Sequence, residues 1–348
     1  MSDGTPEPDC ALRDSGPARP VTLADIARTA GVHVTTVSRA LRGSDDIGRA
    51  TAERIRSVAK QLGYLPNPAA ASLRTGRSRL LGVVVPRLTD VVLATIYEGI
   101  EQGSAEGGYQ TLVANSWDEP DTQKLRADTL LAARVDGLIL GDARTDSGLV
   151  GDLISRGTKV VLTSRSLPGA VSVTGDDRLG GRLAGEHLIS LGHTDMAVIA
   201  GERYASTGIE RTGGFLDACA HAGIEIPESR IVPSRFDVEG GKEGARRLLD
   251  VGPPPTAIFV VNDFAAIGAM GAVRDKGMLV GTDVAIVGYN DLPVAAALPV
   301  ALSTVRSPMR EMGRLAARTL VRMVEGAEGE SVLLPPTFQA RASSLGTT

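Results

Sequence analysis

The chain is poor in the residue types on which several classes of protein depend. Its 348 residues include two cysteines, Cys10 and Cys219, which provide neither a disulfide framework nor a zinc ligand set. The four histidines do not recur at the spacing of metal ligands. We therefore expect no bound metal, no cofactor and no stabilising disulfide bond.

Long apolar segments are also missing. No apolar run reaches the length that spans a bilayer, and the first residues lack the basic and apolar regions of a secretory signal. We therefore expect a protein of the reducing cytoplasm. Residues 1–20 are rich in Pro, Gly, Ser and Asp, and this composition predicts a disordered tail.

The sequence lacks the motifs of the common catalytic sites. There is no Gly-x-Gly-x-x-Gly after an expected strand, no phosphate loop and no nucleophile motif. These absences argue against an enzyme. Aromatic residues make up only 3% of the chain, and Trp117 is the single tryptophan. A binding site built mainly from aromatic rings is therefore not expected.

Charge of one sign does not dominate, but the charges are unevenly placed. Residues 20–79 carry ten Lys and Arg against four Asp and Glu, whereas residues 80–348 carry 25 against 33. A basic segment ahead of an acidic body fits a protein that meets nucleic acid with one of its parts. Chance clustering would give the same imbalance, so this interpretation needs a motif to support it.

Residues 22–42 supply that motif, because they have the pattern of two short helices joined by a tight turn. Thr22 and Asp25 have the spacing of a capping box. Gly31 is a suitable end for the helix, since glycine adopts the left-handed conformation without a Cβ clash. The apolar positions between them follow one helical face: Leu23, Ile26, Ala27 and Ala30.

The second of these helices has an apolar side and an exposed start. Val37, Ala40 and Leu41 are expected to be buried, whereas Val34, Thr35 and Ser38 are expected to be exposed, with Arg39 one turn along. A helix start of this kind fits the major groove of DNA. The sequence therefore predicts a helix-turn-helix that reads a DNA site.

Two further helices are predicted after this motif. The first runs from about Arg49 to Leu62 and ends at Gly63. The second follows Asn67, a good N-cap, and would be only about two turns long, too short to be stable alone in water. It is expected to form only against another surface. A plain interdomain linker is the alternative.

From Leu80 onwards, strand-like runs alternate with helix-like runs. This alternation predicts parallel sheets with helices on both faces. The expected strands are Leu81–Val85, Gln110–Ala114, Gly137–Leu140, Val160–Thr163, Met196–Ile199, Ala257–Val261 and Val284–Val287.

Together these segments resemble the LacI/GalR family of transcription regulators. The resemblance rests on Thr-Leu-x-Asp-Ile-Ala, Ala-Gly-Val and Thr-Val-Ser-Arg-x-Leu within residues 22–41, and it continues through landmarks such as residues 82–86 and 288–291 nearly to the C-terminus. It implies a small all-α helix-turn-helix headpiece and an α/β two-lobed core like that of periplasmic binding proteins, with parallel sheets and helices on both faces.

The resemblance also implies domain boundaries. The helix-turn-helix domain would occupy residues 21–65, a hinge helix and linker residues 66–79, and an effector-binding and dimerisation core residues 80–348. Within the core, the chain is expected to cross between lobes near residues 173, 304 and 332. Lobe one would then hold about 80–172 and 305–332, and lobe two about 173–304 and 333–348.

The implied function is that of a homodimeric repressor on a palindromic double-stranded DNA operator. Val34, Thr35 and Arg39 are the expected base readers, because an arginine matches O6 and N7 of guanine.

By resemblance, Leu73 wedges into a central base step from the minor groove, with Arg74 along that groove; an exposed leucine in a linker is the alternative. Candidate phosphate contacts are Thr22, Thr36, Ser38, Arg42, Tyr64 and Asn67. His33, Arg42 and Gly48 depart from the family pattern.

A small-molecule effector, a sugar or related metabolite, is implied in the cleft between the lobes. The resemblance assigns Arg211, Asn262 and Asn290 to it, with Asp263 and Asp291 orienting loops. Trp117 is the best candidate for stacking. Beside Arg165, Ser164 stands at a position where the family commonly has an acidic residue. This departure motivates the hypothesis of an anionic effector. The first cleft loop is also unusual: residues 90–93 read Asp-Val-Val-Leu, where the family often has Asn-Pro-Phe-Phe.

Other assignments stay open at this point. Within the family, the effector is alternatively a nucleobase or a phosphoprotein co-repressor. Outside it, a sugar-binding transport protein shares the core but needs a signal sequence and no headpiece. A tetramer is possible, although residues 342–348 offer no leucine-heptad tail for one.

Overall fold

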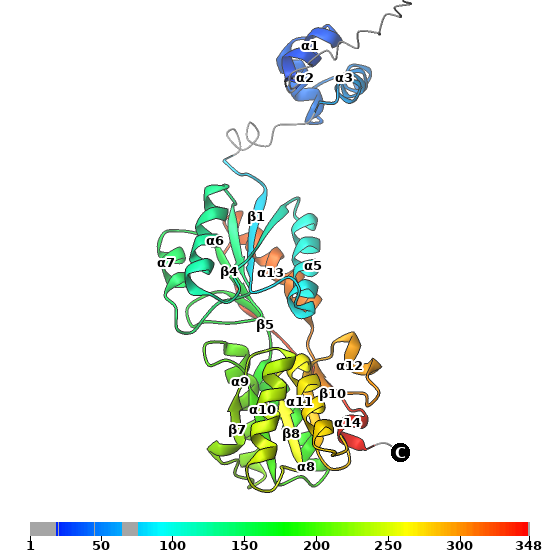
Figure 1. Ribbon diagram of the computed structural model, residues 1–348. Coiled ribbons are helices and arrows are strands. Elements are labelled where there is room, and N and C mark those ends of the chain that lie inside the picture. Colours follow the sequence, from blue (N-terminus) through cyan, green and yellow to red (C-terminus); the bar gives the residue numbers. More distant parts are fainter. Residues whose placement is uncertain (1–18, 20, 45, 65–75, 347–348) are drawn as a thin grey trace, which may run out of the picture. The chain divides into compact units, whose positions relative to one another are not determined.

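The computed structural model describes residues 19, 21–44, 46–64 and 76–346. These residues form two units that are treated separately, one within residues 1–75 and one from Gly76 to Thr348 (Figure 1). Most of the predicted disordered tail and the predicted hinge helix lie outside the described residues. In the part of the chain described here, no helix has the length and apolar character needed to cross a membrane.

The N-terminal unit contains three helices, α1 (Leu23–Ala30), α2 (Val34–Leu41) and α3 (Arg49–Gln61). The predicted capping box is confirmed, since Thr22 and Asp25 exchange both side-chain to backbone bonds at the start of α1. Gly31 ends that helix with a φ of 62°. The three helices bury one small core between them, made of Ile26, Ala27, Ala30, Val37, Ala40, Ala52, Ile55 and Ala59.

The second unit contains two six-stranded sheets, and each sheet forms one lobe. In lobe one the strand order is β11-β5-β4-β3-β1-β2, with every pair parallel. Its strands are β1 (Leu80–Val85), β2 (Gln110–Asn115), β3 (Gly137–Leu140), β4 (Val160–Thr163), β5 (Ser172–Gly175) and β11 (Val332–Leu334). Its helices are α5 (Val91–Glu106), α6 (Pro120–Ala132), α7 (Leu149–Ser155) and α13 (Met309–Val324).

Lobe two repeats this architecture with the strand order β12-β10-β9-β8-β6-β7. Only the β10–β12 pair is antiparallel among its described strand pairs. Its strands are β6 (Met196–Ala200), β7 (Ile231–Pro233), β8 (Ala257–Val260), β9 (Ala285–Asn290), β10 (Ser303–Arg306) and β12 (Thr337–Gln339). Its helices are α8 (Asp177–Ser190), α9 (Ser206–His221), α10 (Val238–Asp250), α11 (Asp263–Asp275), α12 (Pro293–Ala297) and α14 (Ala342–Leu345), with a short 3₁₀ turn at Glu228–Arg230.

The chain crosses between the lobes slightly later than the sequence predicted. Residues 173, 304 and 332 each lie inside a strand, because their pairing holds them in a sheet: Val332 pairs with Val173 in lobe one, and Thr304 pairs with Gly288 in lobe two. The crossings therefore follow β5, β10 and β11. Lobe one keeps the whole of β5 and β11, and lobe two keeps the whole of β10.

Glycines bring α8 and α9 into close contact in lobe two. A Cβ atom on Gly181 would lie 1.9 Å from the carbonyl oxygen of Arg211, and one on Gly214 would lie 1.9 Å from that of Arg178. Neither position has room for a methyl group unless a backbone moves. This contact fixes the depth at which α9 holds Arg211.

We expect Gly181→Ala to lower the free energy of unfolding by about 1–3 kcal/mol, because the added methyl group overpacks the helix contact. Gly151→Ala is the matched control. Gly151 is an exposed glycine within α7 with nothing near its Cβ position, so alanine there should leave stability unchanged or raise it by about 0.5–1 kcal/mol. Denaturant titrations of both variants measure the difference. Equal stabilities would show that α8 and α9 separate without cost.

Candidate functional site

One face of α2 is buried and the other is exposed. Val37 and Ala40 are fully buried, whereas the side chains of Val34, Thr35 and Arg39 are exposed. Val34, the first residue of the helix, is 38% exposed. The three expected base readers therefore lie on the exposed face of α2, opposite the face that packs into the core.

His33 explains how the second helix begins without the usual serine. Its Nδ1 accepts the backbone N–H of Thr35 at 3.4 Å, so the imidazole acts as the N-cap of α2. The same nitrogen lies 2.9 Å from the hydroxyl of Thr35. The Thr35 hydroxyl thus has an internal partner, which leaves its methyl group and Arg39 as the freer groups on this face.

The candidate phosphate contacts differ in exposure. Thr22 is exposed, and its hydroxyl donates to Asp25 at 2.7 Å. Arg42 is exposed, Thr36 and Ser38 are half-buried, and Tyr64 is half-buried against the headpiece core. The candidates Asn67, Leu73 and Arg74 lie outside the described residues.

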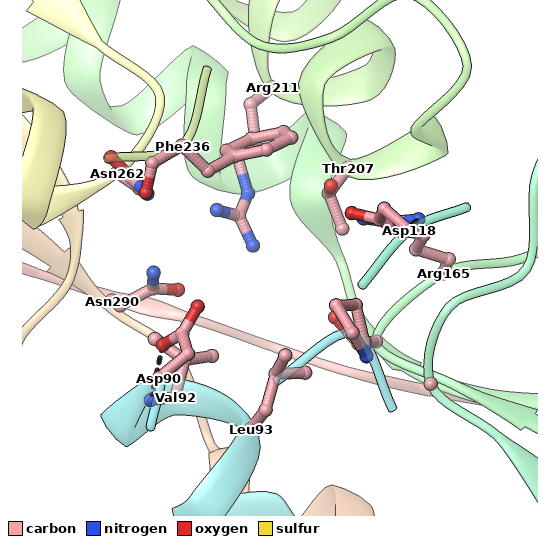
Figure 2. Close-up of a pocket in the computed structure, with 13 residues that line it drawn as sticks. Asp90, Val92, Leu93, Asp118, Arg165, Thr207, Arg211, Phe236, Asn262 and Asn290 are labelled. Atoms are coloured by element: carbon pink, nitrogen blue, oxygen red, sulfur yellow. Dashed lines mark hydrogen bonds and ion pairs between the residues drawn. The ribbon is translucent and has the colours of Figure 1, made fainter. Parts of the chain in front are cut away.

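A cavity of about 80 Å³ lies between the two lobes, at the carboxyl ends of the strands (Figure 2). Such ends are where ligands bind in open α/β sheets. Five of the six expected ligand residues line it, and Trp117 does not. The lining residues are Pro86, Asp90, Val92, Leu93, Asp118, Gly141, Ser164, Arg165, Thr207, Arg211, Phe236, Asn262 and Asn290.

Arg211 is the most firmly held of these side chains. It comes from α9, is buried, and donates from Nε to Asp177 at 2.8 Å and from Nη1 to the carbonyl oxygen of Val261 at 2.8 Å. Its guanidinium carbon lies 3.8 Å from the centroid of the Tyr289 ring. The guanidinium is therefore fixed with its outer edge toward the cavity, as Figure 2 shows.

The two asparagines behave differently from each other. Asn262 is the N-cap of α11: its Oδ1 accepts from the N–H of Ala265 at 2.8 Å, and its Nδ2 donates to the carbonyl oxygen of Phe236 at 2.9 Å. Both the oxygen and the nitrogen of its side-chain amide are thus already hydrogen-bonded within the protein. Asn290 has a φ of 114°, is buried, and its Oδ1 has no hydrogen-bond partner among the described residues. Asn290 is therefore the better placed acceptor for a ligand.

Arg165 does not present a free positive charge. Its two terminal nitrogens donate to the two carboxylate oxygens of Asp118 at 2.7 and 2.8 Å. Asp118 thereby supplies the carboxylate that Ser164 lacks, and the premise of the anionic-effector hypothesis is removed. The neighbouring Ser164 lines the cavity with a φ of 65°.

Asp90 brings an additional carboxyl group to the cavity. It is the N-cap of α5, where Oδ1 accepts the N–H of Val92 at 2.9 Å. Burial raises its pKa, while this hydrogen bond and the charge of Arg211 oppose the rise. Asp90 belongs to no ion pair among the described residues, whereas Arg165 and Arg211 each have a carboxylate partner. The cavity therefore offers hydrogen-bond acceptors and no surplus positive charge.

A wider vestibule of about 480 Å³ lies next to this cavity. It shares Pro86, Asp90, Leu93, Asp118 and Phe236 with the inner cavity. Trp117 lines the vestibule, not the inner cavity. The other residues confined to the vestibule are Arg87, Glu119, Pro120, Arg144, Glu202, Tyr204, Arg235 and Asp237.

Trp117 and Asp118 reach the cleft through an unusual turn after β2. Their φ angles are 57° and 61°, in the left-handed region that costs side-chain-bearing residues roughly 1–3 kcal/mol each. The turn is held to lobe one because the N–H groups of Ser116 and Trp117 donate to the carbonyl oxygens of Val85 and Pro86, each at 2.9 Å. The backbone is thus held in a strained form that presents these two side chains.

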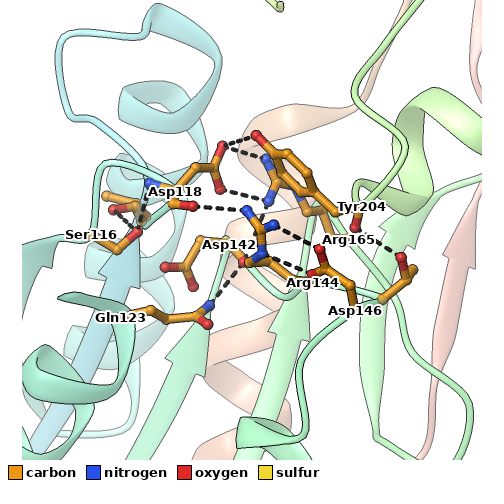
Figure 3. A network of polar contacts seen from close by, with 10 residues as sticks. Ser116, Asp118, Gln123, Asp142, Arg144, Asp146, Arg165 and Tyr204 are labelled. Atoms are coloured by element: carbon orange, nitrogen blue, oxygen red, sulfur yellow. Dashed lines mark hydrogen bonds and ion pairs between the residues drawn. The ribbon is translucent and has the colours of Figure 1, made fainter. Parts of the chain in front are cut away.

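A polar network joins the lobes beside the cavity (Figure 3). The guanidinium of Arg144 in lobe one lies 3.6 Å from the centroid of the Tyr204 ring in lobe two, and the Tyr204 hydroxyl donates to Asp118 at 3.4 Å. Burial and the nearby Asp118 raise the pKa of Tyr204 to about 12, so this hydroxyl stays protonated. The N–H of Thr145 also donates to the carbonyl oxygen of Tyr204 at 3.0 Å.

Two carboxylates near the cleft organise the loops of lobe two. Asp263 accepts from the hydroxyl of Thr304 at 2.6 Å and from the N–H of Leu292 at 2.7 Å. Asp291 accepts from Arg306 and Arg341, each at 2.7 Å. These contacts agree with the loop-orienting role expected from the sequence.

Eight of the thirteen lining residues were not among the expected ligand residues, and four of these have polar or aromatic side chains: Asp90, Asp118, Thr207 and Phe236. Asp90 and Asp118 follow the carboxyl ends of β1 and β2, so their positions after predicted strands were the signal available. Thr207 and Phe236 lie near the starts of α9 and α10. Among the described residues, no group of three or more His, Cys, Asp and Glu side chains is arranged to hold a metal ion.

Comparisons with known proteins match both parts of the chain. Residues 22–67 match the family described as bacterial regulatory proteins, lacI family, and residues 186–344 match the periplasmic binding protein-like domain. The HTH-type transcriptional regulator DegA of Bacillus subtilis is 33% identical over 331 residues, which cover 93% of this chain and 98% of that protein.

Solved structures match over a similar length. The lac repressor dimer bound to operator and the anti-inducer ONPF superposes with a TM-score of 0.87 at 28% identity, covering 94% of this chain and 100% of that chain. The complex of the transcriptional regulator CelR with cellobiose gives a TM-score of 0.71 at 32% identity, covering 93% and 99%. The likeness therefore extends over the headpiece and both lobes.

Proposed function

The chain belongs to the lacI family of bacterial regulatory proteins and is a DNA-binding transcriptional regulator, and we propose that it is a homodimeric repressor controlled by a small molecule between its lobes. The observation that supports this most directly is the pairing, in one chain, of an exposed reading helix with a cavity between two lobes. We further propose that it acts in the cytoplasm, where its operator lies, and that it has no catalytic role.

The proposed effector is a neutral polyhydroxylated molecule of the sugar class. Both arginines of the cavity are paired with carboxylates, while Asp90 and the free Oδ1 of Asn290 are acceptors. Hydroxyl groups donate to such acceptors and accept from the free edge of Arg211. An anion would bring a further negative charge to a cavity that has no unpaired cation.

The proposed control follows from the location of the cavity. Its walls come from both lobes, so a ligand that binds one arrangement of the lobes more tightly shifts the protein toward that arrangement. We propose that the shift alters how the two copies of residues 66–79 meet the operator. The ligand and the operator would then change each other's affinity by the same factor.

The test is to incubate the full-length protein with fragmented DNA of the source organism and to sequence the retained fragments. We expect a palindrome to be enriched, and we expect Arg39→Ala to weaken binding to it roughly 5- to 150-fold, which corresponds to about 1–3 kcal/mol for one base-reading arginine. Arg54→Ala is the matched control, because Arg54 is an exposed arginine on α3 outside the reading face. No enriched sequence, or equal losses in the two variants, would contradict the proposal.

A further inference from the structure

The inner cavity is too small to be the whole ligand site. Its volume of about 80 Å³ lies below the roughly 300–1,000 Å³ that is usual for small-molecule sites. The vestibule of about 480 Å³ adds the missing space, and it opens directly from the inner cavity because the two share wall residues from both lobes. A ligand of ordinary size therefore extends from one into the other.

The vestibule gathers an unusual share of the chain's aromatic residues. The whole chain has five Phe, five Tyr and one Trp, and Trp117, Tyr204 and Phe236 all line this space. Trp117 is 47% exposed, although large aromatic side chains are ordinarily buried. An indole left open at the wall of a cleft offers an apolar platform to a ligand.

The indole is also held in place. The backbone N–H of Trp117 donates to the carbonyl oxygen of Pro86, and the guanidinium carbon of Arg126 lies 5.7 Å from the centroid of the indole ring. A platform fixed in this way loses little freedom when a ligand stacks on it.

The polar residues of the vestibule suit hydroxyl groups. Glu119 and Glu202 line its walls and belong to no ion pair in the described part of the chain, so their carboxylates are free to accept. Arg235 is balanced by Asp237 at 3.1 Å. A flat apolar platform with acceptors around it matches a pyranose ring, which has an apolar face and hydroxyl groups at its edge.

We propose that the vestibule is a second sugar subsite, so that the effector is an oligosaccharide with one unit beside Arg211 and Asn290 and the next unit on the ring of Trp117. This inference rests on the proposed function, since it specifies the size of the same effector. Trp117 then determines specificity for chain length, and the inner cavity determines which unit is recognised.

The experiment is isothermal titration calorimetry on the full-length protein with glucose, galactose and mannose and with the disaccharides cellobiose, maltose, lactose and mannobiose. We expect one disaccharide to bind at least tenfold more tightly than the monosaccharide at its inner end. Because Trp117 is the single tryptophan, its fluorescence emission should shift on binding of that disaccharide.

Two variants separate the platform from general effects. Trp117→Ala should reduce the disaccharide-to-monosaccharide affinity ratio to about 1 while leaving the monosaccharide affinity unchanged. Leu125→Ala removes an apolar side chain that is 58% exposed on α6 and lines neither cavity, and it should leave the ratio unchanged.

The possible failures are distinct. Equal affinity for a monosaccharide and its disaccharide, or a ratio that survives Trp117→Ala, would overturn the second subsite and leave the sugar effector standing. Failure of every saccharide to bind, with operator binding intact, would overturn the sugar class and the subsite together while leaving the DNA-binding assignment in place.

Discussion

Replacing Arg211 with methionine is expected to abolish effector binding and to lower the free energy of unfolding by about 3–5 kcal/mol. Arg211 holds three partners at once: the carboxylate of Asp177, the carbonyl oxygen of Val261 and the ring of Tyr289. Methionine keeps much of the volume but leaves Asp177 as a buried carboxylate without its counter-charge. Breaking a buried pair in this way is strongly destabilising.

The double variant Arg211→Met, Asp177→Asn separates the two effects. Removing the orphaned charge should restore most of the lost stability, because the site then contains no unpaired ion. Effector binding should stay absent, because the guanidinium edge that faces the cavity is still missing. Denaturant titration and calorimetry measure the two quantities. Recovery of effector binding in the double variant would show that Arg211 acts only by holding α8 and α9 together.

The headpiece is the part of the fold that the sequence predicted most completely. Its signals are local: the Thr22–Asp25 capping box, the left-handed Gly31 and the apolar positions of one helical face all act within a few residues. Departures from the family pattern proved compatible with the fold for equally local reasons. His33 caps α2 through its ring nitrogen, in place of a serine hydroxyl.

Most of the strands that contain an apolar run were predicted, and five short strands were missed. The seven predicted strands correspond to β1–β4, β6, β8 and β9. The other five are short, and segments such as Ser-Val-Thr-Gly in β5 have no apolar run. β5 becomes a strand because it pairs with β4 on one side and, on the other, with β11, which lies far away in the sequence. The crossings between the lobes come later than predicted for the same reason, because strand pairing extends β5, β10 and β11 past the predicted positions.

In the site, the sequence indicated which residues reach the cleft but not which residues they bond to. The resemblance indicated that Arg211, Asn262 and Asn290 would reach the cleft, and they line the cavity. It did not indicate their partners. The ion pair of Arg165 joins it to a residue 47 positions away, so the charge of the cavity could not be judged from Ser164 and Arg165 alone.

A second large effect is expected at Asp263, as a dependence of stability on pH. Burial raises the pKa of Asp263 from 3.8 to about 7, with Asp291 adding to the rise and the bonds from Thr304 and Leu292 opposing it. Between about pH 4 and pH 7 the folded protein therefore holds a proton on this group that the unfolded chain has released. Its contribution to stability is greatest below pH 4 and falls as the pH rises to 7.

The size of this effect follows from the shift. At about 1.36 kcal/mol per pKa unit, raising the pH from 4 to above 7 should cost the native protein about 4 kcal/mol at this one residue. In Asp263→Asn the side-chain amide cannot ionise, and it still accepts from Leu292 and donates to Thr304. The variant should therefore gain stability relative to the native protein as the pH rises, by about 4 kcal/mol between pH 4 and pH 8.

Asp275→Asn, at the other end of α11, is the matched control. Hydrogen bonds from Lys242 and Arg274 lower the pKa of Asp275 from 3.8 to about 2. Its carboxylate is therefore charged in both states above about pH 5, and its substitution should give a difference that stays nearly constant from there to pH 8. Denaturant titrations of the two variants and the native protein, followed by circular dichroism at each pH, give the difference in free energy of unfolding between each variant and the native protein. The contributions of titratable groups that all three proteins share cancel in these differences. A difference for Asp263→Asn that stays constant across this range would mean that the two hydrogen bonds outweigh burial, and that the carboxylate holds the loop after β9 and strand β10 in its charged form.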